Sequence, residues 1–307
     1  MADLVIVGAG LSGIAAAKFY LDIHPQSRLV LLEQDSCLGG VFNSRRLYPH
    51  FWTQWTVGTA EFSDMAMPRP PEDDTFYDFF KSKYTTQYLE TYVDEHTFAG
   101  QSLRERIIFG LKVHNISKPD KTWVVSCKDN NNKARDFHAS KLIVASGLTS
   151  IPNMPLLPGT EKFEGPVLHH ESFGQSTVLS SADIRNVTVV GGAKSAADMV
   201  YAAVKAGKTV SWVFRTSGTG PAFFLSAKGK GPYKNAFELG STRLTTTLTP
   251  SFLSPDTWWT RFLHGTSLGN KLVDFVWTAA DKETRRELTA EGRDAIKGFE
   301  KLTPHTP

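Results

Sequence analysis

The chain has 307 residues, of which 41% are hydrophobic and 21% charged, a composition typical of a globular protein and not of a disordered or fibrous one. Its 34 basic and 31 acidic residues are spread along the whole length and give a formal net charge of +3, without the basic stripe that nucleic-acid binding requires. Two cysteines, Cys37 and Cys127, have neither C-x-x-C nor zinc-ligand spacing, so we expect no disulfide scaffold, dithiol centre or metal site.

The first apolar stretch, residues 4–21, differs from both a signal peptide and a membrane anchor. It contains three glycines, Ser12 and Lys18, and Asp3 is the only charge before it. A spanning helix needs about 20 clean apolar residues, and a signal peptide needs a positive start. We therefore expect a soluble protein in the reducing environment of the cytoplasm.

Along the chain, the first segment has the pattern of a βαβ unit. Residues 4–7 and 28–33 are apolar runs that predict two buried parallel strands, and residues 14–21 predict the helix between them. The connection is the glycine-rich turn 8–13.

The middle of the chain predicts an amphipathic helix at 75–84 and then strands between 107 and 128, a polar turn at 129–132 and a strand at 141–145. Proline-rich sequence around residue 155 indicates a boundary. We expect one domain over residues 1–155 and a second over residues 156–307.

A second βαβ pattern follows in the second domain. Residues 187–190 predict a strand, residues 191–196 the turn, and a helix should run to about Ala206 with Gly207 at its end before a strand at 209–214. Composition predicts a charged helix at 281–301. The sequence thus predicts an α/β fold with two Rossmann-like dinucleotide-binding domains.

The first turn has the spacing Gly8-x-Gly10-x-x-Gly13, and Glu33 lies 20 residues further on, at the end of the next strand. Gly8 permits the tight turn, Gly10 lets a pyrophosphate approach the backbone, and Gly13 lets the helix pack closely on the strand. Glu33 can accept both ribose hydroxyls and repels a 2′-phosphate. We expect FAD or NAD here, and a glycine-rich turn without a ligand is the alternative.

The second turn departs from this pattern. Ala193 replaces the middle glycine, and the next strand ends in Arg215, 19 residues past Ala196, where the first unit has an acid. A guanidinium there can bind a 2′-phosphate in a bidentate way, and Lys194 adds a second cation. This predicts NADPH over NADH, and the alternative is an empty unit kept for packing.

Together with further motifs in the same order, these turns resemble those of the flavin-containing monooxygenases and their Baeyer–Villiger relatives, and fungal members most of all. Residues 33–42 are similar to the family's ribose-binding acid and double glycine. Residues 53–55 and 62–64 are similar to its Thr-Asn and aromatic-Ser-Asp elements. Residues 145–147 are similar to its Ala-Thr-Gly strand end, and residues 163–173 to the fingerprint between its nucleotide domains.

The resemblance implies an FAD domain of three ββα layers, followed by an NADPH domain, with site residues at matching positions. Gln54 stands where the family usually has a catalytic asparagine and would lie with Thr53 between the two cofactors. The residues expected to contact FAD are Gly8, Gly10, Leu11, Ser12, Gly13, Glu33, Gln34, Gly40, Val41, Phe42, Thr53 and the backbone of Val113. Those expected to contact NADPH are Lys194, Ser195, Ala196 and Arg215.

By the same resemblance, NADPH would reduce FAD, and the reduced flavin would capture O2 as a C4a-peroxide that oxygenates a small organic substrate, in secondary metabolism. N- or S-oxidation, hydroxylation and Baeyer–Villiger insertion remain open, because the cofactor determines the reagent and not the acceptor. His169 and His170 are as consistent with a structural role as with a functional one.

The family usually continues with a strand and a helix that complete the FAD domain, and nothing after Glu300 matches them. We therefore expect an incomplete NADPH domain, with the missing element supplied by self-association or a partner. A truncated, inactive relative and a flavoprotein reductase are the two alternative functions.

Overall fold

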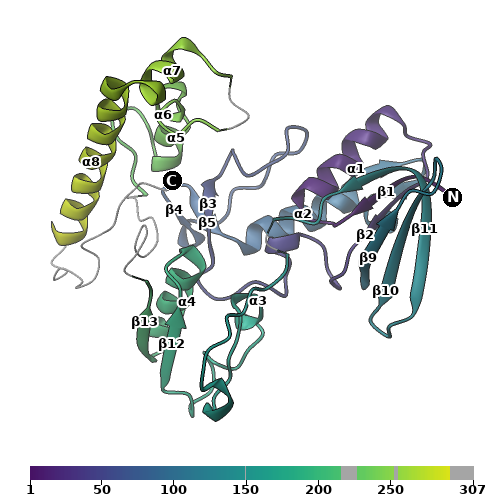
Figure 1. Ribbon diagram of the computed structural model, residues 1–307, viewed down its shortest axis with the longest axis horizontal. Helices are drawn as coiled ribbons and strands as arrows, with labels where there is room; N and C mark the ends of the chain where they lie inside the picture. Colours follow the sequence, from purple (N-terminus) through teal and green to yellow (C-terminus); the bar gives the residue numbers. More distant parts are fainter. Residues whose placement is uncertain (149, 216–226, 252–254, 291–307) are drawn as a thin grey trace. The chain divides into compact units, whose positions relative to one another are not determined.

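The computed structural model describes residues 1–148, 150–215, 227–251 and 255–290, which form two compact units (Figure 1). The first unit comprises Met1–Phe51, Val57–Pro70 and Lys81–Ser176. The second comprises Trp52–Thr56, Pro71–Phe80 and the described residues from Thr177 onward. The division after Ser176 lies beyond the boundary expected near residue 155, and two short segments of the expected first domain belong to the second unit.

The first unit is built on one six-stranded sheet with the order β8-β2-β1-β11-β10-β9. β1 pairs in parallel with both β2 and β11, whereas β9, β10 and β11 form an antiparallel meander. β11 belongs to both parts because its first half pairs with β10 and its second half with β1. The strands are β1 (Ala2–Val7), β2 (Leu29–Leu32), β8 (Ile107–Ile108), β9 (Leu111–Ser117), β10 (Trp123–Asp129) and β11 (Ala134–Val144).

The first unit has three layers, because the parallel strands are covered by the meander on one face and by a helix on the other. On one face, Val5 and Leu32 form a buried core with Val125 and Cys127 of the meander. On the other face lies the helix α1 (Leu11–Ile23), which packs on β1, β2 and β11 and is labelled beside these strands in Figure 1. The expected α/β fold and the ββα layers of the first domain are thus confirmed. The unit also contains α2 (Lys83–Glu95), α3 (His170–Phe173), the short strands β6 (Thr97–Phe98) and β7 (Gln101–Ser102), and the 3-10 turns η1 (Gly40–Phe42), η3 (Arg104–Arg106) and η4 (Thr160–Lys162).

The prediction of a helix at residues 75–84 is wrong. Its place is taken by the strands β4 (Thr75–Phe76) and β5 (Phe79–Lys81), which pair antiparallel. Tyr77 and Asp78 between them have φ values of 50° and 66°. Two consecutive residues with positive φ are typical of a tight type I′ hairpin turn and incompatible with a right-handed helix. The amphipathic helix, α2, begins only at Lys83.

In the second unit, β12 (Asn186–Val190), α4 (Lys194–Lys205) and β13 (Thr209–Val213) form the expected second βαβ unit, with Val187 beside Val210. Gly207 ends the helix with φ +75°, as expected. The segment β3 (Trp52–Thr56) forms a small sheet in the order β3-β5-β4. The other elements are η2 (Glu72–Asp74), α5 (Ala236–Gly240), α6 (Arg243–Thr246), α7 (Trp258–Gly265) and α8 (Ser267–Ala290).

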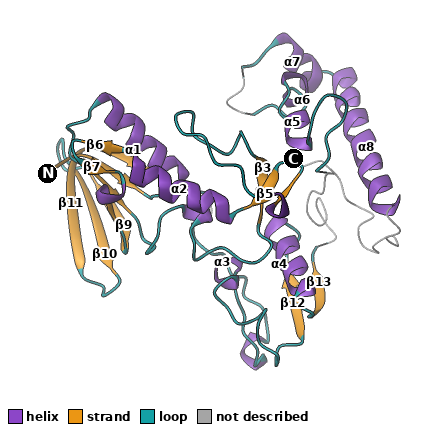
Figure 2. Ribbon diagram, turned by 180° about the vertical axis from the view of Figure 1, so that it is seen from behind, coloured by secondary structure: helices purple, strands orange, loops and turns teal. Residues whose placement is uncertain are grey.

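The charged helix expected at 281–301 corresponds in part to α8, which begins earlier, at Ser267. α7 and α8 are separated only by Thr266 and pack on each other near this junction (Figure 2). A Cβ atom at Gly269 would lie 2.0 Å from the carbonyl oxygen of Phe262, so only glycine permits this crossing. Residues 291–301 of the expected helix lie outside the described residues.

A cluster of polar side chains fixes the segment before α2 in the first unit. The carboxylate of Asp64 lies 2.8 Å from the ammonium of Lys18 on α1. The hydroxyl of Tyr92 on α2 donates to both Asp64 oxygens, at 3.1 and 3.0 Å, and Nε2 of His96 lies 3.0 Å away. The Phe62-Ser63-Asp64 element is therefore bound to both helices.

The charges in this cluster stabilise one another. Burial alone would raise the pKa of Asp64, but hydrogen bonds from Lys18 and Tyr92 lower it below its ordinary value. Hydrogen bonds to Asp22 and Asp64 raise the pKa of Lys18. A carboxyl group with a depressed pKa stabilises the fold above its unfolded pKa of about 4, and this contribution is lost as the pH falls through the folded pKa.

We predict that Asp64→Asn lowers the free energy of unfolding by about 2 kcal/mol at pH 7, because Lys18 loses a half-buried charged partner. Denaturant unfolding at several pH values measures this difference. It should shrink below pH 4, where the wild-type carboxyl becomes protonated. A difference that stays constant down to the lowest pH would contradict the role of the ion pair.

Candidate dinucleotide-binding sites

The first glycine turn is held by close backbone contacts. Gly8 has φ +102°, and its N–H donates to the carbonyl oxygen of Leu32 at 2.8 Å. A Cβ atom at Gly8 would lie 2.4 Å from the carbonyl oxygen of Ala145, and one at Gly13 would lie 1.9 Å from that of Gly8. Both glycines are therefore required by the packing of β1, α1 and the end of β11.

Gly10 is different, because the protein itself does not require a glycine there. Its φ of −82° suits any residue, and a Cβ atom would lie 3.6 Å from the Cα atom of Gly40, an ordinary contact. Gly39 donates its N–H to the carbonyl oxygen of Ala9 at 2.9 Å, which holds the double glycine beside the turn. Gly10 and Gly40 thus present bare backbone to each other. We call these two facing glycines the Gly10–Gly40 cradle; Gly10 is the position where the sequence predicts that a pyrophosphate approaches the backbone.

The N-terminus of α1 adds favourable electrostatics at this place. Gly10 is the N-cap and supplies no side-chain hydrogen bond, and the first turn contains no acidic residue. Its first amide groups are therefore suited to an anion, which the helix dipole also favours. Leu11 is half-buried and Ser12 exposed at this end of the helix.

Glu33 lies where the sequence predicts a ribose-binding carboxylate, directly after β2. It is only 6% exposed, and its two oxygens accept hydrogen bonds from the N–H groups of Ala9, at 2.8 Å, and Asp35, at 2.9 Å. These bonds bring the carboxylate to the glycine turn. Gln34, the next predicted residue, is exposed.

The remaining residues predicted to contact FAD lie around the same strand ends. Val41 is 47% exposed, and the carbonyl oxygen of Phe42 accepts a hydrogen bond from the hydroxyl of Thr86. Val113 is half-buried on β9, where its side chain packs against the core of the meander. The N–H of Leu111 donates to the carbonyl oxygen of Glu33, so β9 begins beside the predicted ribose site.

Thr53 and Gln54 point to opposite faces of β3, as adjacent residues of a strand must. The hydroxyl of Thr53 is buried and donates to the carbonyl oxygens of Trp55 and Phe80, at 2.8 and 3.0 Å. Gln54 is exposed. Of the two residues, Gln54 is the one whose side chain is accessible to a ligand.

The second turn repeats the backbone pattern of the first. Gly191 has φ +129°, and its N–H donates to the carbonyl oxygen of Val213, at the end of β13. Ala193 is the N-cap of α4 without a side-chain hydrogen bond. A Cβ atom at Gly191 would lie 3.7 Å from that of Ala196, an ordinary contact, so the turn has room for the methyl group of Ala196. This spacing explains why Ala196 can replace the third glycine.

The two cations predicted at this site have different surroundings. Arg215 is exposed. It lies two residues after Val213, whose carbonyl oxygen accepts the hydrogen bond from the Gly191 N–H in the turn. Lys194 donates to the carbonyl oxygen of Trp52 at 2.6 Å and pairs with Asp198 at 2.5 Å. A contact between Lys194 and a 2′-phosphate would therefore require exchange of these partners. Ser195 is half-buried in the first turn of α4.

Sequence reasoning missed a polar network beside the double glycine. Asn43 is 1% exposed, donates to Asp35 at 2.8 Å, and accepts from the N–H groups of Arg45 and Arg46. Arg46 also lies 2.9 Å from Glu171 of α3. Asparagine after a glycine pair is a turn signal, but its distant partners have no local signal.

The fingerprint segment has packing roles in the structure. Phe173 is buried against Tyr48, with ring centroids 5.6 Å apart. Nδ1 of His169 accepts from the N–H of Glu171 at the start of α3. Burial lowers the pKa of His170, and the neighbouring His169 lowers it further.

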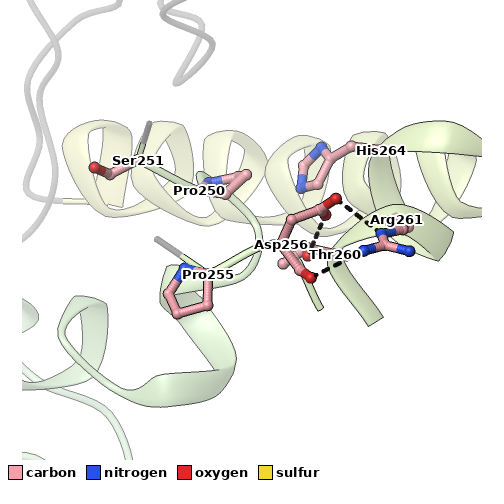
Figure 3. A pocket seen from close by; sticks show the side chains of 7 residues that line it. All are labelled: Pro250, Ser251, Pro255, Asp256, Thr260, Arg261 and His264. Carbon is pink, nitrogen blue, oxygen red and sulfur yellow. Dashed lines mark hydrogen bonds and ion pairs between the residues drawn. The ribbon is translucent and has the colours of Figure 1, made fainter. Parts of the chain in front are cut away.

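A separate hollow of about 480 Å³ lies among the helices of the second unit (Figure 3). Asp256 binds the Arg261 guanidinium at 2.8 Å, and the His264 ring lies 2.8 Å from the carbonyl oxygen of Thr247. None of the predicted site residues lines this hollow. Its lining residues are Pro250, Ser251, Pro255, Asp256, Thr260, Arg261 and His264.

The described residues also bear on two other kinds of site, a metal centre and a membrane span. No group of three or more His, Cys, Asp or Glu side chains in that part of the chain could hold a metal ion. No helix there has the length and apolar character needed to span a membrane.

The fold and the two glycine turns define a protein with two dinucleotide-binding βαβ units. Residues 5–227 match the family described as pyridine nucleotide-disulphide oxidoreductase, and the chain belongs to this family. It is 35% identical to an FAD-dependent monooxygenase of Pyrenophora dematioidea, over 90% of this chain and 52% of that protein. It is 34% identical to the FAD-dependent monooxygenase resA of Aspergillus sclerotiorum, over 86% of this chain and 46% of that protein.

The chain thus spans about half the length of the relatives it matches. Among solved structures, it is similar to a closed cyclohexanone monooxygenase, with a TM-score of 0.65 and 20% identity over 99% of this chain and 60% of that one. It is also similar to Tmm from a Pelagibacter strain, with a TM-score of 0.57 and 21% identity over 71% and 52% of the two chains. These structures show the fold, and the relatives confirm the expected resemblance to fungal flavin monooxygenases.

The contrast between Gly13 and Gly10 gives a stability prediction. Gly13→Ala should lower the free energy of unfolding by about 3 kcal/mol, because the new methyl group would overlap the carbonyl oxygen of Gly8. Gly10→Ala should change it by less than about 1 kcal/mol, because its methyl group meets only an ordinary contact. Denaturant unfolding of the cofactor-free chains compares the two variants. Equal losses would show that Gly10 also serves packing.

Proposed function

We propose that this chain forms the dinucleotide-binding part of an FAD-dependent monooxygenase that uses NADPH and O2 to oxygenate a small organic substrate. The observation that supports this most directly is Gly10 in the Gly10–Gly40 cradle, because packing and backbone conformation do not require a glycine at this position. The names of the relatives support the same reaction. When bound, FAD and NADPH would supply the chemistry, namely hydride transfer to the flavin and activation of O2.

The first site fits FAD through groups of the chain itself. The amides at the start of α1 would bind the pyrophosphate, and the close approach of Gly10 and Gly40 would admit it. Glu33 would accept the ribose hydroxyls, in exchange for or in addition to its bond from Ala9. Gln34 and Val41 are exposed, so their side chains are accessible to a bound FAD.

The second site fits a nicotinamide dinucleotide bound at the start of α4. The uncapped amides there, with Ser195 and Ala196, would bind the pyrophosphate. Arg215 takes the place that Glu33 has in the first unit and would bind the 2′-phosphate of NADPH. We further propose that the exposed amide of Gln54 is the polar group on β3 that acts during the reaction, since it can both donate and accept a hydrogen bond.

The visible spectrum of the purified chain tests the FAD site. After addition of FAD and removal of the excess, the wild-type chain should retain yellow flavin. Gly10→Ala should remain folded but retain at least about tenfold less, because its methyl group occupies the space of the pyrophosphate. Full flavin retention in the folded variant would refute the assignment of the cradle.

Coenzyme selectivity tests the second site. Arg215→Ala should weaken NADPH binding by about tenfold or more and NADH binding much less, because only NADPH has a 2′-phosphate. Titration of each coenzyme into the wild-type and variant chains measures the ratio. A similar loss for both coenzymes would contradict a phosphate contact at Arg215.

A further inference from the structure

Lys194 is the first residue of α4, and its ammonium is bound by the protein. It donates to the carbonyl oxygen of Trp52 at 2.6 Å and to Asp198, four residues along the same helix, at 2.5 Å. The side chains of Lys194 and Asp198 are 31% and 15% exposed. Burial lowers the pKa of Lys194, and the charge of Asp198 acts in the opposite direction.

This position is unfavourable for a cation unless specific partners hold it. A positive charge at a helix N-terminus faces the positive end of the helix dipole, and burial removes part of its hydration. Asp198 offsets the charge, and the Trp52 carbonyl oxygen gives a charge-assisted hydrogen bond. The bond to Trp52 joins residues 142 positions apart in the sequence, so it connects two elements of the second unit.

Trp52 is the first residue of β3, directly before Thr53 and Gln54. The rest of the strand is held at Thr53, whose hydroxyl bonds to Phe80, and by α5, which packs on β3. Lys194 therefore secures the beginning of β3 to the helix that follows the second glycine turn.

We propose that Lys194 is a positioning residue that ties β3 to the start of α4 and so sets the place of Gln54 relative to the second glycine turn. Selectivity for the 2′-phosphate then depends on Arg215 and not on Lys194. The statement about the phosphate rests on the proposed function, whereas the tie between β3 and α4 is a property of the chain alone.

Binding of nucleotide fragments shows whether Lys194 acts as a ligand of the 2′-phosphate or as a positioning residue. We expect Lys194→Met to change the ratio of the affinities for 2′,5′-ADP and ADP by less than about twofold, and Arg215→Ala to lower it by about tenfold or more. Titration calorimetry with each fragment gives the ratio. If Lys194→Met lowers the ratio of the affinities for 2′,5′-ADP and ADP by about tenfold, Lys194 is itself a phosphate ligand, and the proposal is overturned.

Amide hydrogen exchange tests the tie without any ligand. In Lys194→Met, the amides of residues 52–56 should exchange at least about tenfold faster than in the wild type, because local opening of β3 becomes easier. Lys194→Arg should restore slow exchange, since it can donate to the same carbonyl oxygen. Lys205→Met, which removes a cation from the last position of α4, is the matched control and should have no effect on these amides.

In the FAD-loaded chain, Lys194→Met should slow flavin bleaching by NADPH by about tenfold to a hundredfold while the NADPH affinity changes little, since Gln54 is displaced and Arg215 is not. If the amides of residues 52–56 exchange at the wild-type rate in Lys194→Met, Lys194 does not hold β3, and the proposal is overturned. If the chain binds neither fragment, the proposed function fails, and the exchange experiment still decides whether Lys194 holds β3.

Discussion

The first unit depends on one close approach, in which α1 passes so near to β1 that a Cβ atom at Gly13 would lie 1.9 Å from the carbonyl oxygen of Gly8. This contact places the N-terminus of α1 directly over the strand end. The same turn is closed from the other side by Ala145, whose carbonyl oxygen leaves no room for a side chain at Gly8. The start of α1, the double glycine and Glu33 are then brought together at Ala9, whose carbonyl oxygen accepts from the N–H of Gly39 and whose N–H donates to the Glu33 carboxylate.

In the second unit, an alanine replaces the third glycine of the turn, and the hydrogen bond between the turn and the next strand is retained. Ala196 stands where the first unit has Gly13, and a Cβ atom at Gly191 would lie at an ordinary distance of 3.7 Å from the Cβ atom of Ala196. The bond from Gly191 to Val213 corresponds to the bond from Gly8 to Leu32. The third residue of each turn therefore limits how closely helix and strand can pack. In the function we propose, the strand-end residue, Glu33 or Arg215, selects the ribose that the site accepts.

Local patterns were sufficient to predict both βαβ units, because apolar strands, glycine turns and helices follow one another within about 30 residues. They failed at Tyr77 and Asp78, where positive φ angles override an amphipathic pattern. They also could not place Trp52–Thr56 in the second unit, since that depends on contacts with α4 and α5. The partners of Asp64 and Asn43 could not be predicted either, because they are distant in the sequence.

The two cations of the second site show how far a motif alone can be interpreted. Sequence reasoning assigned both Arg215 and Lys194 to the 2′-phosphate, with Arg215 as the main ligand and Lys194 as a second cation. The structure separates them, since the ammonium of Lys194 is bound by Trp52 and Asp198 whereas Arg215 is exposed at the strand end. A buried cation with protein partners contributes to the arrangement of the site, and an exposed guanidinium can form new bidentate contacts at little cost in desolvation. We therefore propose that the two cations of one motif have different physical roles, which follow from the partners that hold Lys194 and from the exposure of Arg215.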